Sequence, residues 1–199
     1  CNAYKAIAQR SGLLPGENVV IFGTGPLGLF SVQIAKIMGA LNIVVVGLEE
    51  DVKVRFGVAR QLGATEVVNG SAEDVVQRCQ EICGGSDSIG LVVDCAGANI
   101  CLKQAIEMVR CNGEIVRVGM GFKPVGFSIN DISMKAVSII GHMAYDATSW
   151  RNALQLLAAG RIQVKPMITH RLGLSRWEEG FEAMANKEAI KVILTYDFD

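Results

Sequence analysis

The chain has 199 residues and a formal net charge of −1, and half of its residues are hydrophobic, so it can form one domain, or one domain and part of another, with a sizeable core. The near-neutral charge, without a basic patch, argues against nucleic-acid binding, and no apolar run approaches the roughly 18 residues of a membrane span. A mean hydropathy of +0.33 favours a missing domain or a subunit interface that covers apolar surface.

The first residue is Cys1 and no signal-peptide pattern follows it, so we expect a fragment of a longer chain. None of the six cysteines forms a Cys-x-x-Cys pair or a zinc-finger spacing. This predicts reduced thiols in a cytoplasmic protein without metal ligands of its own.

The chain opens with a predicted helix within residues 1–13 and then alternates short β-rich runs with amphipathic stretches. Most of the runs are rich in Val and Ile without alternation, as expected for strands that are covered on both faces. The predicted strands are Asn18 to Phe22, Ile43 to Val46, Glu66 to Val68, Leu91 to Asp94, Glu114 to Val118 and Ser138 to Ile140.

Predicted helices separate most of these strands: Leu27 to Met38, Val52 to Leu62, Ala72 to Ile82 with Ser71 as its N-cap, Ile100 to Val109, and Trp150 to Ala159. Such alternation predicts an α/β fold, a doubly wound six-stranded parallel sheet of the Rossmann type with helices on both faces. Residues 161–199 contain a short extended piece, a helix and a last strand, Lys191 to Thr195, which are too few for a second domain.

Three glycines follow the first predicted strand in the order Gly23-Thr24-Gly25-Pro26-Leu27-Gly28. This G-x-G-x-x-G spacing between a strand and a helix is typical of a dinucleotide site, where Gly23 permits the turn, Gly25 lets the backbone approach a pyrophosphate, and Gly28 lets helix and strand pack closely. Pro26 suits the first helical turn, and the helix N-terminus favours an anion. The alternative is that the glycines serve turn geometry alone.

The motif also expects an acid at the end of the second strand for the adenosine ribose, but Gly47 stands there and the acids Glu49, Glu50 and Asp51 follow. Their proximity would repel a 2′-phosphate, which favours NAD, with NADP as the alternative. Arg55 could stack on adenine or meet a phosphate. Glu49 to Asp51 could equally be an acidic helix start with no ribose role.

The run "GLLPGENVVIFGTGPLGLFSVQIAKIMGA" resembles the cofactor domain of zinc-dependent medium-chain dehydrogenases, nearest the sorbitol and threonine dehydrogenase branch. The likeness continues in order through "LGATEVVN" (62–69), "LVVDCAGA" (91–98), "GEIVRVGMG" (113–121) and "GRIQVKPMITHRLGL" (160–174). It therefore covers essentially the whole chain.

The resemblance implies roles for residues that follow the predicted strands. Gly25-Pro26-Leu27 would line the pyrophosphate, and Cys95-Ala96-Gly97 would flank the two riboses. Val118-Gly119-Met120 would border the nicotinamide, and the backbone of His142-Met143 would meet its carboxamide. Cys95 could instead be a small buried residue, and His142 and His170 could be structural.

The resemblance further implies a zinc-dependent alcohol, polyol or amino-alcohol dehydrogenase whose zinc ligands lie upstream of Cys1, with no catalytic residue in this chain. Residues 1–164 would be the dinucleotide-binding domain, with 1–13 as an inter-domain helix. Residues 165–199 would return to an absent catalytic domain, with Thr169-His170-Arg171 near the cleft, and without it could pack loosely or expose apolar surface. Ala144 stands where polyol dehydrogenases often carry an arginine, which puts a polyol substrate in doubt.

Two other functions stay open: a zinc-free quinone or enone reductase of the same superfamily, and a dinucleotide-binding module without catalysis. In either enzyme we expect a small-molecule substrate, turnover that needs the absent domain, and no nucleic-acid or membrane partner. The predicted sixth strand lies near the edge that the family uses for subunit pairing, which implies a homo-oligomer, a dimer or a tetramer.

Overall fold

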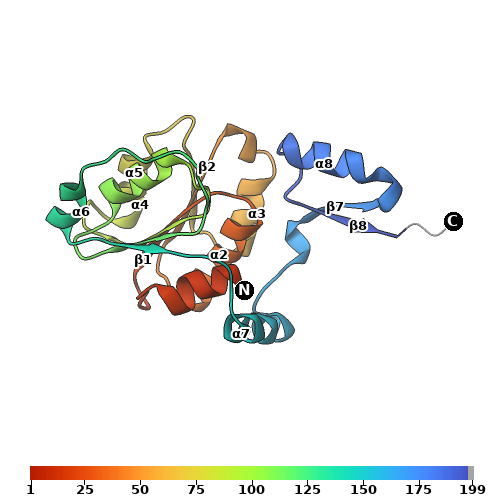
Figure 1. The fold of residues 1–199 in the computed structure, drawn as a ribbon, viewed down its shortest axis with the longest axis horizontal. Helices are drawn as coiled ribbons and strands as arrows, with labels where there is room; N and C mark the ends of the chain where they lie inside the picture. Colours follow the sequence, from red (N-terminus) through yellow and green to blue (C-terminus); the bar gives the residue numbers. More distant parts are fainter. Residues whose placement is uncertain (197–199) are drawn as a thin grey trace.

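A six-stranded parallel sheet forms the centre of the computed structural model, which describes residues 1–196 (Figure 1). The strands lie in the order β3-β2-β1-β4-β5-β6, the order of the classic dinucleotide-binding fold. Their bounds are β1 Asn18–Phe22, β2 Ile43–Gly47, β3 Glu66–Asn69, β4 Ile89–Asp94, β5 Glu114–Arg117 and β6 Ser138–Gly141. The predicted fold class is confirmed.

Alternate residues of each central strand enter two different cores. Val19 and Ile21 of β1 belong to the core under α2 and α3, whereas Val20 and Phe22 belong to the core under α4 and α5. All five residues of β1 are buried. Because side chains of a strand point alternately to its two faces, the uninterrupted apolar run is what a sheet covered on both sides requires.

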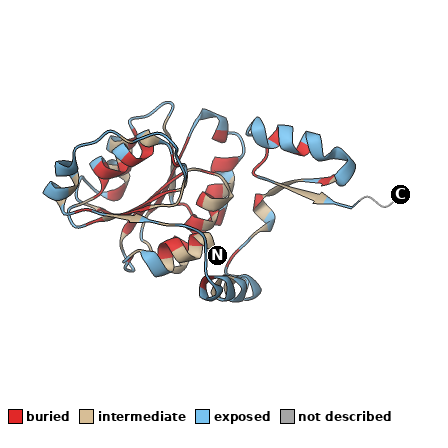
Figure 2. Ribbon diagram, viewed as in Figure 1, coloured by how far each residue is buried: buried red, intermediate tan, exposed pale blue. Residues whose placement is uncertain are grey.

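Helices cover both faces of the sheet, and its central strands β1, β2 and β4 are buried throughout (Figure 2). The bounds are α1 Asn2–Tyr4, continued by the π-helical turn η1 Lys5–Arg10, then α2 Pro26–Ile37, α3 Arg55–Leu62, α4 Val75–Cys83, α5 Asn99–Met108, α6 Ile129–Lys135 and α7 Ala147–Ala158. Among residues 1–196, no helix is both long and apolar enough to cross a membrane.

Several predicted helix boundaries are wrong for identifiable local reasons. Ser71 does not cap α4, because the Asp74 carboxylate accepts from the Gln77 N–H at 3.0 Å and starts the helix there. The predicted helix from Val52 begins at Arg55, after a short 3-10 turn, η2 Glu49–Asp51. The helix expected from Trp150 begins at Ala147, where Asp146 and Ser149 form a capping box.

The short helix α6 was not predicted. It is capped by the Ser128 side chain, which accepts from the Asn130 N–H, and none of its residues is buried. Its 7 residues are fewer than the roughly 11 over which an apolar period can be read, so its sequence carries no clear periodic signal.

The C-terminal residues form a small unit beside the sheet (Figure 1). It contains η3 Lys165–Met167, β7 Ile168–Gly173, η4 Leu174–Arg176, α8 Trp177–Ala185 and β8 Lys191–Thr195, with β7 and β8 paired in parallel. The last three residues of the predicted segment 165–199 lie outside the described residues.

This unit is anchored to the main core by the residues that precede its two strands rather than loosely attached, which corrects part of the expectation. Met167 and Ile190 are buried in the core of the main sheet. In contrast, Trp177 and Phe181 on α8 are exposed and contact each other edge to face. The unit therefore exposes apolar surface on α8, while the residues before β7 and β8 are packed into the main core.

Candidate dinucleotide site

The turn from β1 into α2 has the tight geometry that its glycines predict. Gly23 has φ of +102°, which a side chain would strain. A Cβ on Gly28 would collide with the Gly23 carbonyl oxygen. Gly28 is therefore needed for the close packing of α2 against the end of β1.

Gly25 differs from its neighbours because it faces open space. A Cβ on Gly25 would meet nothing within 4 Å. Gly25 is the N-cap of α2, no side chain caps this helix end, and Pro26 occupies the first turn. The free N–H groups of the first turn and the helix dipole make this end suitable for an anion.

A cavity of about 420 Å3 opens beside this turn. It is bordered by the carboxyl ends of β1, β2 and β4, where ligands bind to open parallel sheets. Of the predicted residues, it is lined by Gly23, Gly25, Gly47, Arg55, Cys95 and Ala96. Asp51, one of the three acids considered for the ribose, also lines it, as do Thr24, Gln104 and Lys187, which were not predicted.

The remaining predicted residues are not among those that line this cavity. Pro26, Leu27 and Gly28 belong to the first turn of α2. Glu49 is exposed on η2, where its carboxylate accepts from the Asn69 amide at 2.6 Å. Gly97, Val118, Gly119, Met120, His142 and Met143 follow β4, β5 and β6.

A buried ion pair holds the loops after β4 and β5 together. Asp94 is fully buried; its carboxylate accepts from the N–H groups of Ala96 and Gly97 and lies 3.1 Å from the Arg117 guanidinium. Arg117 also donates to the Gly97 carbonyl at 2.8 Å. Burial raises the pKa of Asp94, although the Gly97 N–H, Arg117 and the Ala96 N–H oppose the increase.

The two loops are in backbone contact where the resemblance implied the nicotinamide half of a cofactor. A Cβ on Gly97 would lie 2.6 Å from the Met120 backbone nitrogen, and a Cβ on Gly119 would collide with the Gly97 nitrogen. Glycine is therefore required at positions 97 and 119, because any side chain there would push the two loops apart. Asp94 and Arg117 position both loops, yet the sequence offers only their placement at strand ends as a signal.

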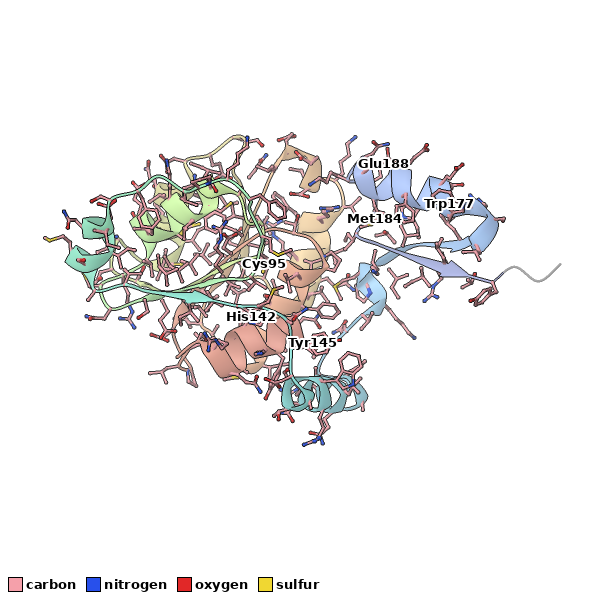
Figure 3. The ribbon with its side chains drawn as sticks, in the orientation of Figure 1. Cys95, His142, Tyr145, Trp177, Met184 and Glu188 are labelled. Carbon is pink, nitrogen blue, oxygen red and sulfur yellow. The ribbon has the colours of Figure 1, made fainter. Side chains whose placement is uncertain are left out.

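Cys95 lies in the central part of the molecule, well separated from Trp177 on α8 (Figure 3). Its sulfur is 3.6 Å from the Ser31 hydroxyl, and burial raises the pKa of the thiol to about 12. The thiol therefore stays protonated at neutral pH and behaves as a small packing residue at the cavity wall.

His142 continues the β5–β6 ladder through its backbone, donating to the Arg117 carbonyl at 3.1 Å. Both of its ring nitrogens are buried without a hydrogen-bond partner among the residues described. Burial, with smaller contributions from Lys5 and Arg10, lowers the pKa of this imidazole. The Met143 side chain is exposed.

The glycine at the end of β2 has a different physical cause from the one expected. Gly47 does not simply leave out a carboxylate; a Cβ there would lie 2.5 Å from the Phe56 ring and 2.8 Å from an Asp51 oxygen. Arg55 is buried and bonds to Asp51 at 3.3 Å and to the Ala189 carbonyl at 2.8 Å. Its guanidinium is therefore already engaged.

No group of three or more His, Cys, Asp or Glu side chains within residues 1–196 is placed to hold a metal ion. All six cysteines are free thiols.

The strand order and the glycine turn between β1 and α2 define a protein with a Rossmann-type α/β fold. Residues 26–159 match the zinc-binding dehydrogenase family, and the chain belongs to that family. The predicted resemblance is confirmed.

Three relatives illustrate the match. The zinc-type alcohol dehydrogenase-like protein YdjL of Escherichia coli (strain K12) is 74% identical over all of this chain and 55% of its own length. Sorbitol dehydrogenase of Gallus gallus is 34% identical over 95% of this chain and 52% of its own. The solved alcohol dehydrogenase TADH from Thermus sp. ATN1 has a TM-score of 0.88 and 30% identity, over 98% of this chain and 55% of its own. The chain spans about half the length of these relatives.

Proposed function

We propose that this chain binds a nicotinamide dinucleotide, NAD in preference to NADP, across the carboxyl edge of its sheet. The observation that carries the proposal is the open space above Gly25 at the uncapped start of α2. There, Gly25, Pro26 and Leu27 would hold the pyrophosphate. The cavity bordered by Gly47 and Arg55 would take the adenosine half.

The loops joined by Asp94 and Arg117 would hold the other half of the cofactor. Cys95, Ala96 and Gly97 would flank the riboses, and Val118, Gly119 and Met120 would border the nicotinamide. The backbone of His142 and Met143 would meet the carboxamide. These residues orient the cofactor, and the nicotinamide supplies the hydride chemistry when bound.

The whole protein is proposed to be an oxidoreductase that transfers hydride between an alcohol, polyol or amino alcohol and the nicotinamide. Its zinc would be held by residues outside this chain, and residues 165–199 would complete a catalytic domain beside the 1–164 dinucleotide-binding domain. The six free thiols suit a cytoplasmic location. A quinone or enone reductase remains the second candidate, and a metal-binding Cys and His-Glu pair in the rest of the protein would decide against it.

Calorimetric titration of the 199-residue chain with NAD and NADP tests this function. We expect one dinucleotide to bind at one site, with no alcohol oxidation by the isolated chain. Failure of both dinucleotides to bind would contradict cofactor binding. Measurable alcohol turnover by the chain would contradict the placement of the catalytic centre outside it.

We also propose that the protein self-associates through β6, one of the two edge strands of the sheet. The N–H groups of Ser138 and His142 donate to carbonyls of the β5 segment. Because successive N–H groups of a strand point to opposite sides, the Gly141 N–H points to the open edge. Gly141→Pro removes that edge donor, and a Cβ at this position meets nothing within 4 Å. Light scattering should show a dimer or tetramer that the variant weakens; a monomeric parent chain would contradict pairing.

A further inference from the structure

We propose that Asp51 is the residue that makes the adenosine end of the cavity select a free ribose 2′-hydroxyl, as in NAD, over a 2′-phosphate, as in NADP. This inference rests on the proposed function and identifies the side chain that would bind the ribose 2′-hydroxyl. It follows from three features at the end of β2.

The first feature is that the end of β2 has no room for a side chain of its own. A Cβ on Gly47 would lie 2.5 Å from Phe56 Cε1, 2.7 Å from Thr24 Cγ2 and 2.8 Å from Asp51 Oδ2. The Asp51 carboxylate therefore occupies the space into which a strand-end side chain would project, although Asp51 comes later in the chain, after the η2 turn.

The second feature is how the carboxylate is held. Asp51 is 6% exposed, and its Oδ2 accepts from the Leu48 N–H at 2.8 Å. Asp51 also lines the cavity that Gly25 borders. A carboxylate has about four acceptor positions, so this oxygen pair retains capacity for a hydroxyl donor. A phosphate would bring a negative charge of about −1.5 to −2 to the same place, where the low dielectric makes repulsion strong.

The third feature is that Asp51 forms an ion pair with Arg55, a buried cation that also borders the cavity. Arg55 is 7% exposed, and its Nη1 lies 3.3 Å from Asp51 Oδ1 while its Nη2 donates to the Ala189 carbonyl at 2.8 Å. Its Nε is buried without a partner among the residues described. The charge that could attract a 2′-phosphate is thus balanced and fixed by the same carboxylate.

The remaining charges near this end do not reverse the selection. Lys187 lines the cavity but is exposed, so solvent and salt screen its charge. Glu49 and Glu50 are exposed on η2 and add negative charge. The balance depends mainly on whether Asp51 is ionised beside Arg55.

The Asp51→Asn variant tests this assignment because it keeps the size of the side chain and an oxygen for the Leu48 N–H. It removes the charge that balances Arg55. Calorimetric titration of the 199-residue chain should show NAD binding at least about tenfold tighter than NADP in the parent. In D51N, the affinity for NAD should fall about tenfold and the affinity for NADP should rise about tenfold.

Two further variants isolate the Asp51–Arg55 pair. Glu50→Gln removes an exposed carboxylate of the same turn and should leave the NAD-to-NADP ratio within about threefold of the parent. In D51N/R55Q the gain in NADP affinity should disappear while the loss of NAD affinity remains. The thermal unfolding midpoint of each variant shows that it is folded. If D51N alone does not fold, the NAD affinity of the double variant decides.

Several results would overturn the inference while leaving dinucleotide binding intact. These are NADP binding as tightly as NAD in the parent, an unchanged ratio in folded D51N, an equal shift in E50Q, or unchanged NAD affinity in the double variant. Failure of the parent to bind either dinucleotide would remove the proposed function and this inference together.

Discussion

Replacing Gly28 with alanine is expected to destabilise the chain by about 2 kcal/mol and to weaken dinucleotide binding by at least about tenfold. The added methyl group would collide with the Gly23 carbonyl oxygen, which is backbone and cannot rotate away. Overpacking of this kind costs about 3 kcal/mol, and the helix propensity of alanine returns about 1 kcal/mol. Relief requires α2 to move away from β1, which also moves the N–H groups at its start.

Gly25→Ala is the matched control, because the two glycines belong to the same turn. A methyl group at Gly25 meets nothing within 4 Å, and φ there is −72°, which any residue adopts. We expect a change in stability below about 1 kcal/mol but a loss of affinity of at least about tenfold, because the methyl occupies the space proposed for the pyrophosphate. Denaturant unfolding and calorimetric titration separate the two effects. Equal loss of stability in both variants would show that Gly28 is no more tightly packed than Gly25.

Arg117→Met is expected to cost about 3 kcal/mol of unfolding free energy. The substitution leaves the Asp94 carboxylate, which is fully buried, without its ion-pair partner at 3.1 Å. It also removes the donor to the Gly97 carbonyl. Because these contacts join the loops after β4 and β5, we expect the nicotinamide end of the site to lose its shape together with stability.

The double variant Asp94→Asn/Arg117→Met tests the cause of that loss. Asparagine keeps an oxygen for the Ala96 and Gly97 N–H groups but carries no charge, so the double variant should be more stable than Arg117→Met alone. Denaturant unfolding of the parent, both single variants and the double variant gives the coupling energy. A double variant that loses the sum of the single losses would show that the buried pair is not the cause.

The strands of the sheet were predicted within two residues at each end, because Val/Ile runs buried on both faces carry a strong local signal. The turn at Gly23, Gly25 and Gly28 was equally visible, since its spacing and its flanking elements are local. Helix starts were less well predicted. Asp74 and Asp146 compete with neighbouring polar residues for the N-cap, and only the folded backbone shows which of them bonds.

The site was predicted in part, and the missing residues share one property. Asp94 and Arg117 meet across two strands, Arg55 reaches the Ala189 carbonyl, and Lys187 enters the cavity from the C-terminal unit. Each contact joins residues distant in the sequence, so neither periodicity nor motif spacing can reveal it. Asp51 was visible as one of three neighbouring acids, but not as the one whose carboxylate is buried.

The sequence by itself determined the doubly wound parallel sheet and the glycine turn, because these follow from the pattern of apolar residues and from backbone freedom within short stretches. Only the tertiary structure decided which carboxylate lies beside Gly47, which cation it engages, and how the loops after β4 and β5 are held. Those choices depend on space and charge at positions where separate elements meet, and the chain acquires such positions only when it folds.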